Sequence, residues 1–322
     1  MKVLLTGAAG FIGFHVSKYL LERGDTVLGV DNLTPYYDVS LKEDRLKALQ
    51  HKNLVFEKLD LLDDDALSSF CNTHKPDRII HLAAQAGVRY SIDHPKDVIN
   101  TNVVAFMNIL MQAHTLDVDH FVYASSSSVY GSNQHIPFKV TDNVDHPISM
   151  YAATKKSNEL MAHVYSHLYQ LPSTSLRFFT VYGPWGRPDM SAFLFADAIY
   201  KGETIKLFNH GNHRRDFTYI DDIVAGVVKV LDSAPTKDAK HYALYNIGNN
   251  QPVELLHFVK LIEEAIGKKA ITELVDMQPG DVEETYADID AISEDLGYQP
   301  TTSIDVGITK LIDWYKSYYG HE

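Results

Sequence analysis

Short apolar runs alternate with longer amphipathic segments along roughly the first 180 residues of the chain. The apolar runs are typical of strands buried on both faces of a parallel sheet, and the longer segments have helical spacing. The expected strands are Lys2–Leu5, Thr26–Val30, Leu54–Leu59, Arg78–Leu82, His120–Ala124 and Leu171–Phe179, and the expected helices are Phe14–Arg23, Asp64–Thr73, Asp97–His114 and Tyr151–Tyr169. This order predicts an α/β fold with a doubly wound parallel sheet.

Beyond residue 180 the alternation becomes irregular. We expect helices at Ser191–Lys201, Asp221–Leu231 and Glu254–Ile266, and strands at Ile205–Phe208, Phe217–Ile220 and Ala243–Ile247. We therefore predict a nucleotide-binding domain over residues 1–180 and a smaller C-terminal α/β lobe that binds substrate over residues 181–322. Segments between residues 215 and 250 are expected to return to the main sheet.

Composition restricts the partners of this chain. Its formal net charge of −13 argues against nucleic acid, because a phosphate backbone demands clustered Lys and Arg. No apolar run approaches the roughly 18 residues that a membrane span needs, so no membrane partner is expected. A single cysteine, Cys71, excludes an intrachain disulfide and suits the reducing cytoplasm. The 16 histidines form no metal-binding motif such as H-E-x-x-H. His163 and His167 have a helical spacing that would permit a metal site, but no third ligand is obvious nearby, so no metal is expected.

A glycine-rich loop follows the first expected strand, with Gly7, Gly10 and Gly13 at the spacing G-x-x-G-x-x-G. Glycines let the backbone pass close to a pyrophosphate, and the start of the next helix offers unpaired N–H groups and partial positive charge. Asp31, which follows the second strand, can accept hydrogen bonds from an adenosine ribose and would repel a 2′-phosphate. The unit predicts a Rossmann-type domain that binds NAD rather than NADP.

Two further segments carry catalytic side chains. Tyr151 and Lys155 are four residues apart, so on a helix both point to one side. A fixed Lys charge lowers the pKa of a neighbouring phenol, which makes Tyr151 a general base. Ser126 or Ser128 would hydrogen-bond the hydroxyl oxygen that Tyr151 deprotonates, and Lys155 would also hold the nicotinamide ribose. Together with an NAD loop, these residues predict hydride transfer at a carbinol carbon.

Five motifs carry a family resemblance. They are T-G-x-x-G-F-x-G at Thr6–Gly13, S-S-S-S-V-Y-G at Ser125–Gly131, Y-A-A-T-K at Tyr151–Lys155, R-F-F-T-V-Y-G-P at Arg177–Pro184 and R-D-F-T-Y-I-D-D at Arg215–Asp222. Over essentially its whole length the chain resembles the extended short-chain dehydrogenases/reductases, in the branch of NAD-dependent sugar-nucleotide epimerases and dehydratases. Within this branch, the stretch TVYGPWGRPDM at Thr180–Met190 is similar to that of UDP-glucuronate 4-epimerases.

The resemblance implies an enzyme that interconverts UDP-glucuronate and UDP-galacturonate. C4 would be oxidised with bound NAD, the 4-keto sugar would rotate, and C4 would be reduced again from the opposite face. The resemblance also implies a homodimer, paired through the Tyr151 helix and the Asp97–His114 helix of each copy. The expected cofactor contacts are Gly7, Gly10, Phe11, Ile12, Gly13, Asp31, Asn32, Asp60, Leu61, Leu82, Ala83, Ala84, Gln85, Asn102, Ser125, Tyr151, Lys155 and Phe178.

The expected substrate contacts include three arginines. Arg187 follows a Gly-Pro-Trp-Gly loop, where a guanidinium could bind a carboxylate in bidentate fashion. The resemblance assigns Arg187 and Thr180 to the sugar carboxylate and Arg215 to the UDP phosphates. The other expected contacts are Arg89, Ser127, Gln278 and Asp281; Gln278 stands where related glucose-type epimerases carry a basic residue.

Several alternatives share the scaffold. A 4,6-dehydratase would carry an Asp-Glu pair where this chain has Ser127 and Ser128, and a UDP-glucuronate decarboxylase would carry a Glu nearby. A UDP-glucose 4-epimerase, or another NAD-dependent nucleotide-sugar epimerase, remains open, although Arg187 and Thr180 favour a carboxylated sugar. A non-enzymatic NAD-binding scaffold is disfavoured, because the Tyr151–Lys155 pair is intact.

Overall fold

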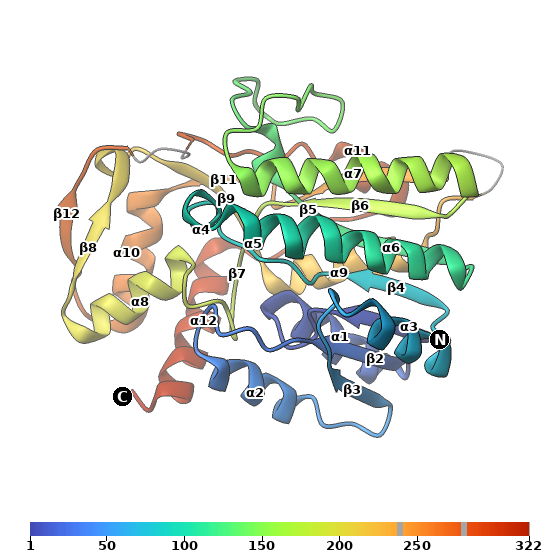
Figure 1. Cartoon of the computed structure of the whole chain (residues 1–322). Coiled ribbons are helices and arrows are strands. Elements are labelled where there is room, and N and C mark those ends of the chain that lie inside the picture. The colour runs from blue at the N-terminus through green and yellow to red at the C-terminus, as the bar shows by residue number, and fades with distance from the viewer. Residues whose placement is uncertain (237–240, 278–281, 322) are drawn as a thin grey trace.

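The computed structural model of the chain describes residues 1–236, 241–277 and 282–321. Over these residues the backbone forms a seven-stranded parallel sheet and two small sheets of three and two strands (Figure 1). In spatial order the main sheet consists of β10 (Tyr242–Ile247), β6 (Ser173–Phe178), β5 (His120–Ser126), β4 (Arg78–His81), β1 (Lys2–Thr6), β2 (Thr26–Asp31) and β3 (Leu54–Lys58). The α/β fold and its doubly wound parallel sheet are confirmed.

The main sheet separates two hydrophobic cores because alternate residues of a strand point to opposite faces. Val3 and Leu5 of β1 belong to one core and Leu4 belongs to the other. The helices of the first core include α1 (Phe11–Arg23) and α9 (Ile220–Asp232), and those of the second include α3 (Asp64–His74), α6 (Ala105–Thr115) and α7 (Met150–Tyr169). Helices therefore cover both faces of the sheet.

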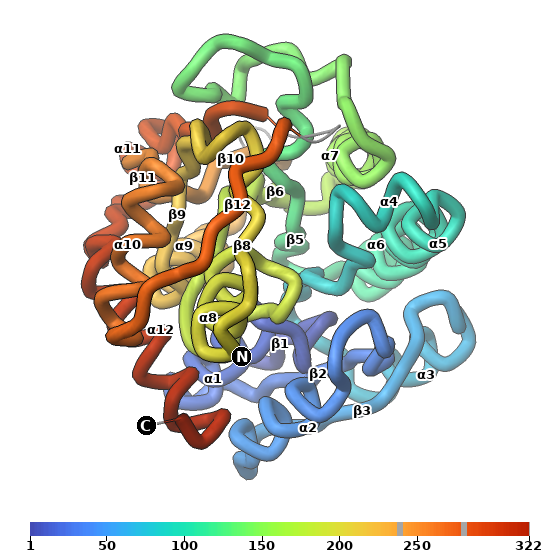
Figure 2. The backbone as a smooth tube through the Cα atoms, turned by 90° about the vertical axis from the view of Figure 1, so that its left-hand side faces the viewer, coloured from blue at the N-terminus to red at the C-terminus, as the bar shows by residue number. Residues whose placement is uncertain are grey.

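A smaller lobe lies at one end of the sheet and faces the viewer in Figure 2. Its strands are β7 (Thr180–Tyr182), β9 (Arg214–Tyr219) and β11 (Pro252–Glu254) in one sheet, and β8 (Thr204–Leu207) and β12 (Ile271–Leu274) in the other. Its helices are α8 (Ser191–Lys201), α10 (Leu255–Ile266) and α12 (Ile304–Tyr319). The expected strand Phe217–Ile220 overlaps β9 of this lobe up to Tyr219, and Ile220 begins α9. Strand β10, by contrast, pairs in parallel with β6 in the main sheet. The domain boundary at residue 180 stays a prediction.

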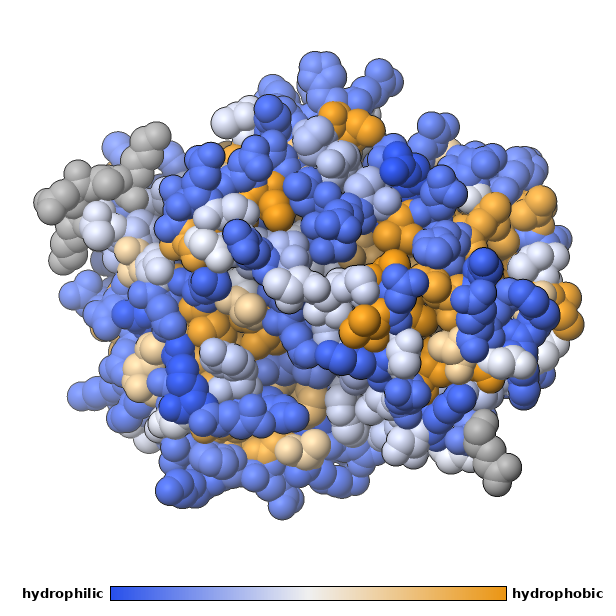
Figure 3. Space-filling view, turned by 180° about the vertical axis from the view of Figure 1, so that it is seen from behind, coloured by the Kyte–Doolittle hydropathy of each residue, from blue (hydrophilic) through white to orange (hydrophobic). Residues whose placement is uncertain are grey.

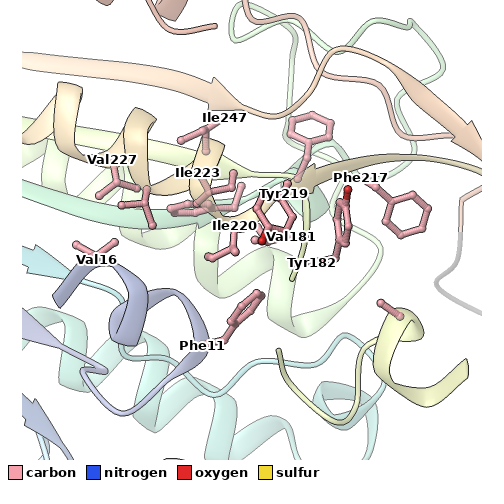
Figure 4. Packing of buried hydrophobic residues seen from close by; sticks show 14 of the residues in the cluster. Phe11, Val16, Val181, Tyr182, Phe217, Tyr219, Ile220, Ile223, Val227 and Ile247 are labelled. Atoms are coloured by element: carbon pink, nitrogen blue, oxygen red, sulfur yellow. The ribbon is translucent and has the colours of Figure 1, made fainter. Parts of the chain in front are cut away.

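The helix after the glycine loop also packs against the small lobe. Phe11, the first residue of α1, shares a buried cluster with Val181 of β7 and Ile220 of α9 (Figure 4). His15 of α1 also hydrogen-bonds the Pro184 carbonyl at 2.9 Å, so α1 contacts the loop that follows β7.

Three differences from the expected elements bear on the site. Helix α1 begins at Phe11 rather than Phe14. The helix expected at 97–114 is divided into α5 (Pro95–Ile99), a π-helical turn and α6. The sequence did not predict α2 (Val39–Ala48), whose buried residues are Leu41, Lys42 and Arg45. Two of these three are charged, so the segment lacks the apolar periodicity of an amphipathic helix.

A buried ion pair joins α7 to β6. The Nε and Nη2 atoms of Arg177 donate to the two carboxylate oxygens of Glu159 at 2.8 and 2.9 Å, and Ser125 Oγ donates to the same carboxylate at 2.7 Å. Burial alone would raise the pKa of Glu159, but the hydrogen bonds and charge of Arg177 outweigh it and lower the pKa below its ordinary value of 4.5.

We expect the substitution Glu159→Gln to lower the free energy of unfolding by about 3 kcal/mol, because it leaves the Arg177 charge buried and unpaired. The contribution of the ionised Glu159 is complete above 4.5, the ordinary pKa, and is lost as the pH falls through the depressed folded-state pKa. Urea unfolding should therefore show the full difference between wild type and variant at pH 7 and a smaller one below pH 4. A difference that grew on acidification would contradict this account.

Candidate active site

The carboxyl ends of the main-sheet strands meet at one edge, which is where open α/β sheets bind their ligands. Most of the predicted cofactor residues lie there: Gly7 follows β1, Asp31 ends β2 and Asn32 follows it, Asp60 and Leu61 follow β3, Leu82, Ala83, Ala84 and Gln85 follow β4, Ser125 is in β5, and Phe178 ends β6. The topology therefore gathers residues that are up to 171 positions apart, from Gly7 to Phe178.

The glycine loop fits a pyrophosphate. Gly7 has φ +74°, and a Cβ on it would lie 2.8 Å from the Ala83 nitrogen. A Cβ on Gly13 would lie 2.0 Å from the Gly7 carbonyl oxygen, so neither position accepts a side chain without moving the loop. Gly10 occupies the N-cap of α1 and has no side chain to cover the first-turn N–H groups, those of Phe11 and Ile12 included. These N–H groups and the helix dipole suit an anion.

Asp31 braces the glycine loop and the next loop together. Its carboxylate accepts from the backbone N–H of Ala9 at 3.2 Å and of Leu33 at 2.8 Å. Asn32 donates to Asp60 at 3.1 Å, which ties the ends of β2 and β3. The sequence reasoning missed Lys42, whose Nζ lies 3.9 Å from Asp31. A cation therefore stands beside the carboxylate that we expect to meet the ribose.

Asn102 fixes the backbone after β4. It lies in the π-helical turn Asn100–Val104, is buried, and both accepts from the Gln85 N–H at 2.8 Å and donates to the Gln85 carbonyl at 3.1 Å. Its amide also donates to Thr154 Oγ1 at 3.2 Å, and Asn158 donates to the Asn102 carbonyl at 2.6 Å. Asn102 thus connects the segment after β4 to the helix that carries Tyr151.

The serines and the Tyr151 pair come together at the start of α7. Ser126 Oγ donates to Ser128 Oγ at 3.1 Å, and the Tyr151 hydroxyl hydrogen-bonds Ser126. Lys155 is buried, and its Nζ donates to the Ala124 carbonyl at 3.0 Å and lies 6.0 Å from the centre of the Tyr151 ring. Burial lowers the pKa of Lys155 to about 8. A phenol, an amine and two hydroxyls therefore share one site.

The pKa of Tyr151 differs from the sequence-based expectation. Burial raises it above the ordinary value of 10, while the charge of Arg187 and the hydrogen bond with Ser126 act to lower it. We expected Lys155 to favour the phenolate, but in the chain by itself burial dominates, and the opposing charge belongs to Arg187. Further positive charge, such as that of an oxidised nicotinamide ring, would be needed to bring the pKa of this base toward neutrality.

Arg187 lies in the loop between β7 and α8, within electrostatic range of Tyr151. Its Nε and Nη2 atoms donate to the two oxygens of Asp189 at 2.9 and 2.5 Å. Tyr36 donates its hydroxyl proton to Asp189 at 3.1 Å. The sequence analysis missed both partners, although Asp189 follows Arg187 by two residues in the R-P-D segment.

Arg45 joins the cofactor loop to the loop that carries Arg187. Its Nη1 donates to the Ala9 carbonyl at 2.9 Å, and its Nη2 donates to the carbonyls of Trp185 at 2.6 Å and Gly186 at 3.2 Å. The side chain is fully buried, and burial lowers its pKa. The sequence analysis gave Arg45 no role because helix α2 was not predicted.

The other predicted substrate residues that the structure describes lie in several different elements. Thr180 begins β7 and pairs with Phe217 of β9, and Ser127 follows β5. Arg89 lies with its guanidinium 5.0 Å from the centre of the Phe208 ring. Arg215 donates to the backbone carbonyls of Arg214, Val282 and Glu283. Gln278 and Asp281 lie outside the described residues.

Over the described part of the chain, His, Cys, Asp and Glu side chains form no group of three or more that could hold a metal ion. Within the same residues, no helix is long and apolar enough to cross a membrane. The site offers the phenol of Tyr151, the amine of Lys155, the hydroxyls of Ser126 and Ser128 and the guanidinium of Arg187.

Comparison with known proteins gives consistent matches. Residues 3–248 match the NAD dependent epimerase/dehydratase family. Protein CapI of Staphylococcus aureus is 51% identical, over 99% of this chain and 99% of its own. The probable UDP-glucuronate 4-epimerase of Rhizobium meliloti (strain 1021) is 46% identical, over 99% of this chain and 98% of its own. The crystal structure of a UDP-glucuronic acid 4-epimerase from Bacillus cereus, in complex with UDP-glucuronic acid and NAD, has a TM-score of 0.92 at 34% identity and covers 99% of this chain and 100% of that one.

Proposed function

The chain belongs to the NAD dependent epimerase/dehydratase family, and within that family we propose that it is a UDP-glucuronate 4-epimerase. In this reaction UDP-glucuronate and UDP-galacturonate are interconverted by inversion at C4 of the sugar. The enzyme class and the cofactor NAD follow from the family. The choice of substrate rests on the side chains around Tyr151.

The observation that carries this choice is the position of Arg187 beside Tyr151. Arg187 acts on the pKa of the Tyr151 hydroxyl, so a cation lies close to the proposed base. In a hexuronate the C4 hydroxyl and the C6 carboxylate are borne on neighbouring ring carbons, C4 and C5. A base for the hydroxyl and a cation for the carboxylate must therefore be neighbours in the enzyme.

Bound NAD would supply the hydride acceptor for oxidation at C4 and the hydride donor for re-reduction from the opposite face. The chain's own residues manage the proton and the orientation. Tyr151 accepts the proton of the 4-hydroxyl and later gives it back, while Ser126 and Ser128 hydrogen-bond the same oxygen. Lys155 holds the ribose next to the nicotinamide, the glycine loop holds the pyrophosphate, and Arg215 holds the phosphates of UDP while the sugar turns.

Arg187 has a second task in this proposal. The oxidised sugar carries a ketone at C4 and a carboxylate on C5, so it is a β-keto acid that can lose CO2. Decarboxylation requires the C5–C6 bond to stand perpendicular to the plane of the C4 carbonyl. A guanidinium that binds the carboxylate in two places, with Thr180 as a second donor, restrains movement into that position. The same contact therefore selects the substrate and protects the intermediate.

The experiment is to incubate the purified enzyme with UDP-glucuronate and with UDP-glucose separately and to follow C4 inversion by NMR. We expect UDP-galacturonate from the first substrate and little turnover of the second. Equal or faster turnover of UDP-glucose would reject the carboxylate assignment in favour of a UDP-glucose 4-epimerase. CO2 as the main product would instead indicate a decarboxylase.

The assembly is also part of the proposal: we infer a homodimer that pairs through α6 and α7. These helices lie side by side at the surface (Figure 1). Leu160, Val164 and Leu168 of α7 are 57%, 48% and 61% exposed and lie four residues apart, so they form one apolar stripe. A soluble chain seldom leaves such a stripe uncovered, and a second copy would bury it.

We expect light scattering after size exclusion to give the mass of two chains. Leu160→Glu combined with Leu168→Glu should give one chain, because the dimer would bury both charges. Figure 3 shows the opposite face, where apolar side chains gather toward the small lobe. The control is therefore Leu256→Glu in α10, 51% exposed in that lobe. Loss of the dimer only in the control would assign the interface to the lobe instead.

A further inference from the structure

Within residues 1–236, 241–277 and 282–321, Arg187 makes hydrogen bonds with only part of its guanidinium. Asp189 takes up the edge formed by Nε and Nη2, at 2.9 and 2.5 Å. Among the described residues, no hydrogen bond involves Nη1 of Arg187. A planar guanidinium can bind one carboxylate along its side edge and a second at its end, where Nη1 and Nη2 lie. The end edge is the one that remains for a ligand.

Asp189 is itself held in place. Pro188 separates it from Arg187, and the proline ring fixes the backbone φ between the two charged residues. Tyr36 donates to its carboxylate at 3.1 Å from the loop between β2 and α2. The ring of Tyr36 makes an edge contact with Tyr90, with centroids 5.2 Å apart. The hydroxyl that anchors Asp189 is therefore fixed as well.

We propose that Asp189 is a positioning residue for substrate selection: it holds Arg187 by the Nε–Nη2 edge, with Tyr36 as its anchor, so that the end of the guanidinium meets the C6 carboxylate. This inference rests on the proposed function, because it concerns how the same arginine recognises the sugar acid. A free arginine side chain samples many rotamers, and fixing it in advance reduces the entropy lost on binding.

The opposite role for Asp189 is physically distinct. As an internal competitor, it would occupy Arg187 until the substrate carboxylate displaced it. The structure favours the positioning role, because the short Pro188 link and the Tyr36 hydrogen bond hold Asp189 in place. In addition, Nη1 of Arg187 makes no hydrogen bond with the described residues and can donate to a ligand. The two roles predict opposite signs for the effect of removing the Asp189 charge.

The test measures two quantities in each variant and in the unaltered enzyme. Calorimetry on the NAD-loaded enzyme gives the dissociation constants for UDP-glucuronate, UDP-glucose and UDP, and kinetics give the KM for UDP-glucuronate. Asp189→Asn should weaken UDP-glucuronate binding and raise this KM roughly tenfold, by the loss of charge-assisted hydrogen bonds. Its affinity for UDP should not change. Tyr36→Phe keeps the ring contacts and should weaken UDP-glucuronate binding about threefold, the effect of one modest hydrogen bond.

The matched control is Asp197→Asn. Asp197 also accepts from a cation and from a tyrosine hydroxyl, Lys201 at 2.7 Å and Tyr315 at 2.8 Å, and its side chain is 33% exposed against 30% for Asp189. It lies in α8, outside the site, so its substitution should change none of the three dissociation constants.

Tighter binding of UDP-glucuronate by Asp189→Asn would overturn the inference and make Asp189 a competitor. Weaker binding of all three ligands would overturn it in favour of a structural role. If the unaltered enzyme prefers UDP-glucuronate and Asp189→Asn keeps that preference in full, the inference alone fails. If the unaltered enzyme does not distinguish UDP-glucuronate from UDP-glucose, the proposed function fails and the inference falls with it.

Discussion

Tyr151→Phe is expected to lower kcat with UDP-glucuronate roughly 1000-fold while NAD stays bound, because it removes a general base and keeps the ring. The hydroxyl that is lost lies beside Ser126 and faces the charge of Arg187. The amine of Lys155, the neighbouring titratable group, already donates to the Ala124 carbonyl at 3.0 Å. Initial rates by NMR and the NAD content of the purified variant give the two measurements.

Tyr165→Phe is the matched control for this experiment. It also removes a tyrosine hydroxyl from α7, but about four turns from Tyr151 and outside the site. Its kcat should equal that of the unaltered enzyme. If Tyr151→Phe kept more than about a tenth of the unaltered kcat, it would rule out Tyr151 as the essential base, since a positioned base contributes at least about 100-fold.

The second large effect is expected from Arg187→Lys. The substitution keeps the positive charge but replaces the planar fork with a single ammonium group. We expect kcat/KM for UDP-glucuronate to fall roughly 100-fold, because a charge-assisted bidentate contact is lost. Affinity for UDP should be unchanged. A larger share of the converted substrate should appear as CO2, since the carboxylate of the keto sugar is less restrained.

A second variant separates the charge of Arg187 from its geometry. Arg187→Met combined with Asp189→Asn removes the cation without leaving an unpaired carboxylate. The charge of Arg187 acts to lower the pKa of Tyr151, so its removal should shift the rising limb of the kcat–pH profile to higher pH. Arg187→Lys should not shift it. If the kcat–pH profile were the same in all three enzymes, the charge of Arg187 would not influence the pKa of Tyr151, which would contradict this account.

Much of the fold follows from local patterns in the sequence. Short sequence patterns predicted several elements to within a few positions. These patterns are the apolar runs of β4, β5 and β6 and the glycine loop before α1. The family, the enzyme class and NAD as cofactor were identified from motifs and are confirmed. Helix α2 was not predicted because two of its three buried residues, Lys42 and Arg45, are charged. Charged residues indicate an exposed position as long as their partners are unknown.

The candidate site was less predictable, because its geometry depends on contacts between distant segments. Arg45 reaches Trp185, 140 positions away, and Tyr36 reaches Asp189, 153 positions away. No local pattern encodes such pairs. The sequence predicted that Lys155 would lower the pKa of Tyr151, whereas in the structure burial raises it and Arg187 supplies the opposing charge. Helical spacing places Lys155 on the same side of the helix as Tyr151, but burial and the approach of Arg187 depend on the tertiary fold. The roles of the individual site residues stay predictions.

The most direct test of the central claim follows one hydrogen atom. UDP-glucuronate that carries deuterium at C4 is converted in ordinary water by the purified enzyme, and the product is analysed by NMR and mass spectrometry. Inversion through oxidation and re-reduction at C4 predicts UDP-galacturonate with the deuterium kept at C4. Loss of the label to water, or the absence of UDP-galacturonate, would contradict the account.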